Sequence, residues 1–309
     1  MKPEENVIKR LAFVKYLYKV AVEQSEKPEP LCSASILIFH DAIELFLQLA
    51  SEYLDVGKAQ PSFLEYWDLL SQKLRDHELT QKESMRRLNK ARVALKHHGT
   101  LTSKLDIEAF RASATNFFKE NAPIVFDILF SDISLIELVQ CEDARSSLKK
   151  AEEELKDNKI EDALDKTAVA FAQLIDDYES RKRDRFGRSP FFFGESMTHL
   201  SSFHMGIDRA GKSELGQLAE FIDNAKETIE ALQNAVKILS LGIDYRRYVK
   251  FRLLTPYVYR MFDGHYLIRR NQWGSRGIPT AEDVQFCIDF VIESAITLQE
   301  FDFSIEKQG

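Results

Sequence analysis

The stretch RVALKHHG at residues 92–99 places Arg92 five positions before His97, with His98 next and a glycine directly after. A guanidinium presents a forked set of N–H donors that matches phosphate oxygens, and an imidazole exchanges a proton near neutral pH. RNA carries its own nucleophile, the 2′-hydroxyl, so its cleavage requires neither a metal ion nor a protein nucleophile. It requires a base for that hydroxyl and a cation that stabilises the charge on the phosphorane. Arg92 and His97 are residue types that can supply both.

These residues close an expected helix, and the arrangement resembles the Arg-x(4–6)-His signature of HEPN domains. That family consists of small all-α bundles and includes many metal-independent ribonucleases. The segment FHDAIE at 39–44 also looks like the family's second helix, which commonly carries an acidic residue in an apolar frame. The resemblance covers about residues 1–135. The chain differs at Val93, where many active members have a polar residue.

The resemblance implies a site built from two helices. It implies Arg92 as the phosphate clamp and His97 as general base or acid, with His98 as the alternative histidine. The supporting residues would be Asn89, Lys96, Asp41 and Glu44. The resemblance also implies a homodimer through the N-terminal domain, in which two copies bring their arginines and histidines to one cleft.

The five-residue spacing separates the two groups within one chain. Five residues of α-helix turn through about 500°, which leaves Arg92 and His97 about 140° apart on a regular helix. Either the last turn before Gly99 unwinds and swings the histidine, or a second copy supplies it. An exposed basic last turn that only favours the helix dipole is the alternative interpretation of the same residues.

His40, Asp41 and Glu44 form a second group that has two interpretations. A histidine and a glutamate one helical turn apart can bind a metal ion. We favour a polar stripe that packs against the neighbouring helix, oriented toward Arg92, and we expect no metal and no cofactor.

Apolar residues at helical spacing predict an N-terminal bundle over residues 1–135. The helices are expected at about 4–24, from Ser33 or Ser35 to Gly57, and at about 62–75, 80–98 and 107–121, with a short one from Pro123 to Phe130. The second is apolar nearly all round, so we expect it at the centre of the bundle. Gly99 is the expected cap of the fourth.

Residues 136–309 predict a mainly helical second domain. The expected helices cover about 142–157, 160–180, 213–241 and 279–301, and the first two turn at residues 157–159. The Asp263-Gly264 dipeptide lies between aromatic and β-branched residues, which predicts a small β-hairpin near 257–270. The fold class is therefore all-α with one small hairpin.

Two basic segments stand out in a chain whose net charge is −7. RKRDRFGRSPFFFGES at 181–196 reads as an exposed loop, and we expect it to contact RNA or a partner protein through Arg181, Lys182, Arg183, Arg185 and Arg188. Residues 245–276 mix arginines with aromatic rings, a combination that suits single-stranded RNA. There we favour a core role for Tyr248, Phe251, Leu254 and Tyr257, with the arginines paired to acidic helices at 142–165.

The segment GIDRAGKS at 206–213 spells a P-loop pattern, but no strand and no parallel sheet are expected around it. We interpret Ser213 as a helix N-cap instead.

Three widely spaced cysteines exclude a disulfide scaffold and a cysteine-based zinc site. No uncharged apolar run is long enough to span a bilayer, and the polar N-terminal stretch has no signal-peptide core. We therefore expect a cytoplasmic protein without membrane contact. The favoured function is a metal-independent endoribonuclease, a toxin or an anti-phage defence effector, with RNA and a protein of a defence or toxin–antitoxin system as partners. The alternative is a non-catalytic helical module that docks on a partner protein or RNA.

Overall fold

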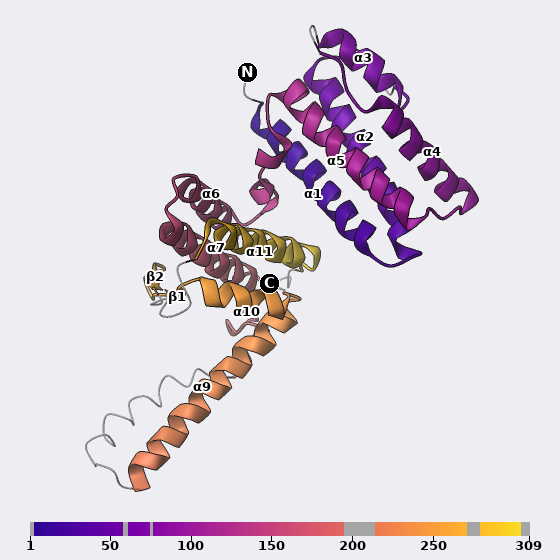
Figure 1. Cartoon of the computed structure of the whole chain (residues 1–309). Coiled ribbons are helices and arrows are strands. Elements are labelled where there is room, and N and C mark those ends of the chain that lie inside the picture. Colours follow the sequence, from indigo (N-terminus) through magenta and orange to yellow (C-terminus); the bar gives the residue numbers. More distant parts are fainter. Residues whose placement is uncertain (1–2, 58–60, 75–76, 195–213, 271–278, 304–309) are drawn as a thin grey trace. The chain divides into compact units, whose positions relative to one another are not determined.

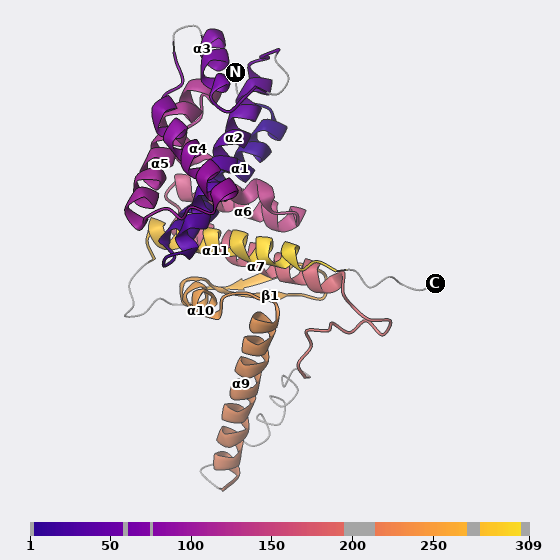
Figure 2. The same cartoon turned by 90° about the vertical axis from the view of Figure 1, so that its right-hand side faces the viewer.

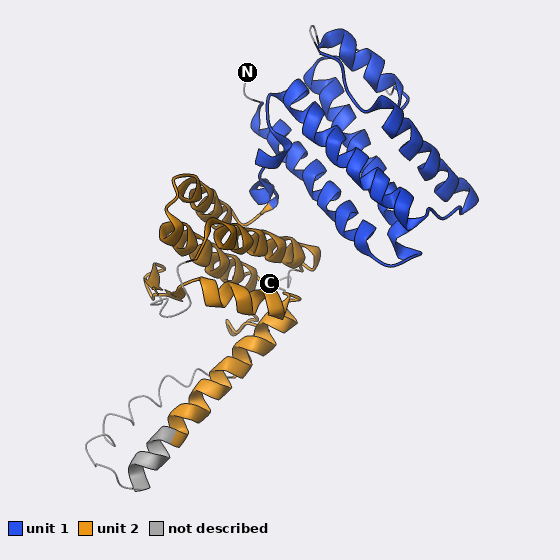
Figure 3. Ribbon diagram, viewed as in Figure 1, with its two compact units in different colours: residues 1–138 blue, residues 139–309 orange. Residues whose placement is uncertain are grey.

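The computed structural model describes residues 3–57, 61–74, 77–194, 214–270 and 279–303 (Figure 1). The chain divides into two compact units, residues 1–138 and 139–309 (Figure 3). The described elements are helices apart from one two-stranded hairpin. The predicted fold class, all-α with a small β-hairpin, is confirmed.

Unit 1 is a helical bundle. Its described elements are α1 (Glu5–Glu26), η1 (Leu31–Ala34), α2 (Ser35–Tyr53), α3 (Glu65–Lys73), α4 (Lys82–His98), α5 (Lys104–Phe126), η2 (Phe130–Asp132) and η3 (Leu135–Leu138). Helix α2 contacts α1, α3, α4 and α5, so the predicted central helix is confirmed. Its Phe46 is fully buried and meets the rings of Phe117, Phe118 and Phe126 of α5 edge-on.

The central helix also explains the one candidate membrane span among the described residues. Leu31–Tyr53 is long and apolar enough to cross a membrane by length and composition, and 56% of its most apolar window is buried inside the protein. Burial of this kind is what the core helix of a bundle requires, because such a helix meets neighbours on nearly every side.

Helix α4 carries the arginine and the two histidines. Met85 and Leu88 are buried, and Ala91 packs against the cluster of Cys32, Ile36 and Ile107. The helix ends at Gly99, whose φ of 65° lies in the left-handed region that favours glycine. Its N–H donates to the carbonyl of Leu95. The predicted cap is confirmed, and the helix remains regular through His98.

Helix α5 differs from the prediction at both ends. It begins after Ser103, whose hydroxyl accepts from the Asp106 N–H, and continues through Pro123 to Phe126. The expected separate helix opening at Pro123 is therefore wrong. Proline lacks one donor, but burial of Val125 and Phe126 keeps the last turn on the core.

Unit 2 is built on two packed helices. Its described elements are α6 (Glu142–Lys156), α7 (Ile160–Ser180), α9 (Glu214–Ser240), α10 (Tyr245–Leu254), β1 (Tyr257–Arg260), β2 (Tyr266–Arg269) and α11 (Ala281–Glu300). Figure 2 shows α7 and α11 side by side. Phe171 of α7, Phe251 of α10 and Phe290 of α11 meet ring to ring in the core.

The hairpin pairs β1 with β2 in antiparallel register, with Tyr257 opposite Arg269 and Arg260 opposite Tyr266. Arg270, the residue after β2, forms ion pairs with Glu161, Asp162 and Asp165 of α7. The favoured core role of Tyr248 and Phe251 is confirmed. The predicted pairing of the arginines with residues 142–165 holds for Arg270, whereas Arg247 pairs with Glu293 and Arg260 with Asp176. Tyr257 differs: it is exposed, with the Arg252 guanidinium over its ring.

Candidate functional site

Arg92 lies half-buried on the flank of α4 that faces α2. Asn89, three residues earlier, and Lys96, four residues later, share its side of the helix because these spacings return to one face. Asn89 is half-buried and Lys96 is exposed. No ion pair to Arg92 forms within the described ranges, so its guanidinium remains available to an anion.

His40 of α2 is the buried group beside this arginine. It is 2% exposed, and its ring stacks on Phe63 with 4.3 Å between centroids. The Nδ1 atom lies 3.7 Å from Asp41 Oδ1 and 3.7 Å from Glu44 Oε2. Neither ring nitrogen has a hydrogen-bond partner within ordinary distance and angle limits.

Two effects lower the pKa of His40 below its usual value. Burial is the larger, because it penalises the imidazolium, and the nearby Arg92 charge acts in the same direction. Glu44, Asp41 and Asn89 oppose them without reversing the shift. His40 is therefore neutral at neutral pH, with a free nitrogen lone pair.

The supporting residues Asp41 and Glu44 lie around this histidine and differ in exposure. The Asp41 side chain is 61% exposed and the Glu44 side chain 36%. Asn89, Arg92, His40, Asp41 and Glu44 thus gather where α2 and α4 meet, as the interpretation of a polar stripe oriented toward Arg92 expects.

His97 and His98 lie apart from this group. Both are exposed in the last turn of α4, and the helix does not unwind before Gly99. The expectation that the last turn swings His97 toward Arg92 of the same chain is therefore wrong for this structure, since the capped glycine holds the turn closed. Within one copy the regular helix keeps Arg92 and His97 on different faces.

Val93, the residue that departs from the family pattern, is 38% exposed on the same helix. It presents a methyl surface beside Arg92 where a polar side chain would add a donor. The positive charge on this side of α4 therefore comes from Arg92 and Lys96.

The basic loop of unit 2 divides into two parts. Arg183, Arg185 and Arg188 are exposed, and the Asp184 carboxylate accepts from the N–H groups of Phe186 and Arg188 to shape the turn. These three arginines can meet a phosphate or an acidic partner.

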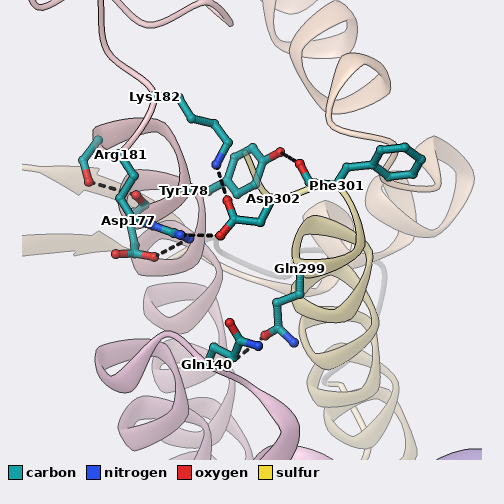
Figure 4. Close-up of polar contacts among 9 residues, drawn as sticks. Gln140, Asp177, Tyr178, Arg181, Lys182, Gln299, Phe301 and Asp302 are labelled. Carbon is teal, nitrogen blue, oxygen red and sulfur yellow. Dashed lines mark hydrogen bonds and ion pairs between the residues drawn. The ribbon is translucent and has the colours of Figure 1, made fainter. Parts of the chain in front are cut away.

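Lys182 contradicts the predicted exposed loop, because its side chain is fully buried. Its ammonium donates to Asp302 Oδ1 at 2.5 Å and lies 3.5 Å from the centre of the Tyr178 ring (Figure 4). Arg181 donates to the other oxygen of Asp302 and pairs with Asp177. Aromatic packing and one carboxylate bury the lysine, so it cannot contact RNA.

The sequence pattern predicts His40 as part of a polar stripe, and its nearly complete burial is the feature that this prediction missed. A signal for its burial was present: Ile36, Ile43 and Leu47 stand four before, three after and seven after it, and all three are buried. This spacing places the histidine on the apolar face of the helix. Residues 206–213, with the P-loop pattern and the predicted N-cap at Ser213, lie outside the described residues.

Comparisons of the chain with protein-family models, with curated proteins and with solved structures find no significant match.

Proposed function

We propose that this protein is a metal-independent endoribonuclease of HEPN type, with Arg92 binding the scissile phosphate. One observation carries the proposal: Arg92 is half-buried beside a neutral histidine and has no ion-pair partner within the described ranges. A half-buried guanidinium without an ion-pair partner is suited to bind a phosphate, because no carboxylate of the same chain competes for its N–H donors.

His97 acts as general base or acid on the 2′-hydroxyl and the leaving oxygen, with His98 as the alternative. Both are exposed and near the helix end, where they can reach a bound strand. Because one copy holds Arg92 and His97 on different faces, the productive pair comes from two copies of unit 1. Lys96 adds positive charge along the strand, and the supporting residues Asn89, Asp41 and Glu44 surround His40 beside Arg92.

The biological setting follows from the resemblance alone. In that setting the protein is a toxin or an anti-phage defence effector that acts on RNA in the cytoplasm and is controlled by a partner protein. The exposed Arg183, Arg185 and Arg188 offer a docking surface for that partner or for the RNA.

Cleavage of a labelled RNA by the purified full chain in excess chelator tests the proposal. We expect products ending in a 2′,3′-cyclic phosphate, because the 2′-hydroxyl is the nucleophile. Arg92→Ala and His97→Ala should each reduce the cleavage rate at least about a hundredfold, the usual contribution of a positioned proton-transfer group or charge-stabilising donor. Arg87→Ala, which removes an exposed arginine of the same helix, is the matched control.

Unchanged cleavage by Arg92→Ala and His97→Ala would refute the assignment. The second candidate function, a non-catalytic docking module, is favoured by the separation of Arg92 from His97 within one chain. It predicts no cleavage by wild type. It also predicts harmless overexpression of both wild type and His97→Ala, whereas a nuclease should be toxic only with His97 intact.

A further inference from the structure

His40, Asp41 and Glu44 support Arg92 in the proposed function, and they also have an arrangement that RNA cleavage itself does not require. One ligand atom from each residue lies within 4.8 Å of the other two. All three come from two turns of α2, a fully regular helix, so their relative positions depend on one rigid element. A site on such an element is held more precisely than one assembled from loops.

The second observation is the buried imidazole itself. His40 is 2% exposed, and neither nitrogen has a hydrogen-bond partner within ordinary distance and angle limits, although the Asn89 side chain lies near enough to act on the ring. A buried polar atom without a partner costs free energy, so a group of this kind calls for a ligand or a bonded neighbour. Its Nδ1 points toward both carboxylates at 3.7 Å, which is too long for a hydrogen bond to either.

We propose that His40 Nδ1 and one oxygen each from Asp41 and Glu44 bind a divalent transition-metal ion of the zinc class. Bonds of about 2.1 Å in a tetrahedral site separate neighbouring ligand atoms by about 3.4 Å. The two distances of 3.7 Å from Nδ1, and the distance between the two carboxylate oxygens of at most 4.8 Å, shorten to this value if the partly exposed Asp41 and Glu44 side chains rotate. The exposed side of the cluster leaves the remaining coordination position to water.

The donor set selects the metal. One imidazole and two carboxylates suit zinc, cobalt or manganese, whereas magnesium and calcium prefer oxygen ligands throughout. The ion would neutralise two adjacent carboxylates and occupy the free lone pair of His40. The Phe63 ring stacks on His40 and covers one face of its imidazole.

Arg92 is the feature that opposes the ion. Its positive charge acts on His40, so a cation bound there is repelled as well. Removing this charge should therefore tighten metal binding, an effect that a purely structural polar stripe does not predict. The inference stands apart from the proposed function, because the cleavage assay contains chelator and this test measures binding alone.

Calorimetric titration of the chelator-treated full chain with zinc chloride, together with the visible absorption of added Co²⁺, tests the site. We expect one bound ion in wild type. Asp41→Asn and Glu44→Gln should each weaken binding at least about tenfold, since even loss of a group that supports a metal ligand has this effect. Both carboxylates are partly exposed, so these variants should fold.

The control Glu108→Gln removes an exposed carboxylate of the same unit and should bind as wild type does. A His97→Ala/His98→Ala chain should retain the ion, which separates this site from the exposed histidines. Arg92→Gln should bind more tightly than wild type. Absence of zinc binding to wild type would overturn the inference. So would equal binding by the Asp41→Asn/Glu44→Gln double variant, or weaker binding by Arg92→Gln.

Discussion

The carboxylate of Asp302 accepts hydrogen bonds from Arg181 and Lys182, so its protonation should change the stability of unit 2. Burial opposes the shift, but hydrogen bonds from Lys182 and Arg181 hold the pKa of Asp302 below its ordinary value. A carboxyl group with a lowered folded-state pKa contributes stability above its unfolded pKa, near 4, and loses it as pH falls through the folded value.

Asp302→Asn should therefore flatten the acid side of the stability profile. At pH 7 we expect a loss of about 1–3 kcal/mol, because Lys182 stays buried without its counter-charge. Between about pH 5 and pH 2 the difference from wild type should shrink, as protonation removes the same interaction from wild type. Calorimetric melting of the full chain measures both, with Glu153→Gln as the exposed-carboxyl control. A stability difference between Asp302→Asn and wild type that does not change with pH would contradict this assignment of the lowered pKa to Asp302.

At the residue scale, the sequence predicts which groups carry charge but not where each charge lies. Arg181, Lys182 and Arg183 are adjacent in one basic run, yet Lys182 is buried and Arg183 exposed. The difference arises from Asp302, 120 positions away, and from the Tyr178 ring. His40 shows the opposite case, because its local apolar spacing was sufficient to indicate burial.

The last turn of α4 is the element on which the exposed histidines depend. Gly99→Ala should destabilise this turn by about 1 kcal/mol, because the added Cβ meets open space and the cost is the left-handed backbone alone. In the Gly99→Ala variant, hydrogen exchange of the amides at 96–99 should therefore be faster than in wild type. Gly57→Ala is the matched control, since its Cβ also meets open space and its φ is not positive. Equal effects of the two substitutions would contradict this account.

Helices with strong local signals were predictable from the sequence. The turn between α6 and α7 follows the expected residues 157–159, with Asn158 in the left-handed conformation, and the Asp263-Gly264 hairpin forms as expected. Pro123 was misleading because a proline normally marks a helix start. The aromatic contacts of Phe126 with Phe46 and Tyr53, distant in sequence, keep α5 continuous.

At the scale of the whole molecule, the compact units divide between residues 138 and 139, and the helical pattern of the sequence predicts the end of the first bundle at residue 135. The candidate site belongs to unit 1 alone. Its Arg92 and its exposed histidines lie on different faces of α4, so the proposed catalytic pair requires a second copy of the chain.

We propose a homodimer through unit 1, which would bring the two groups together. In a twofold arrangement each surface meets its own copy, so Arg92 of one chain can face His97 of the other, and two equivalent sites form. Light scattering of the full chain should show a dimer at tens of micromolar, and the cleavage rate per chain should fall on dilution as the dimer dissociates.

Mixing two inactive variants gives the sharper test. In a dimer of one Arg92→Ala chain with one His97→Ala chain, one shared site has lost both groups and the other retains both. Random pairing makes half the dimers mixed, so an equal mixture should recover about a quarter of the wild-type rate. If the site lies within one chain, or if the protein is a monomer, the mixture should show no cleavage. A dimer joined instead through residues 213–241 would also leave the mixture inactive, and that result would favour the docking module over the nuclease.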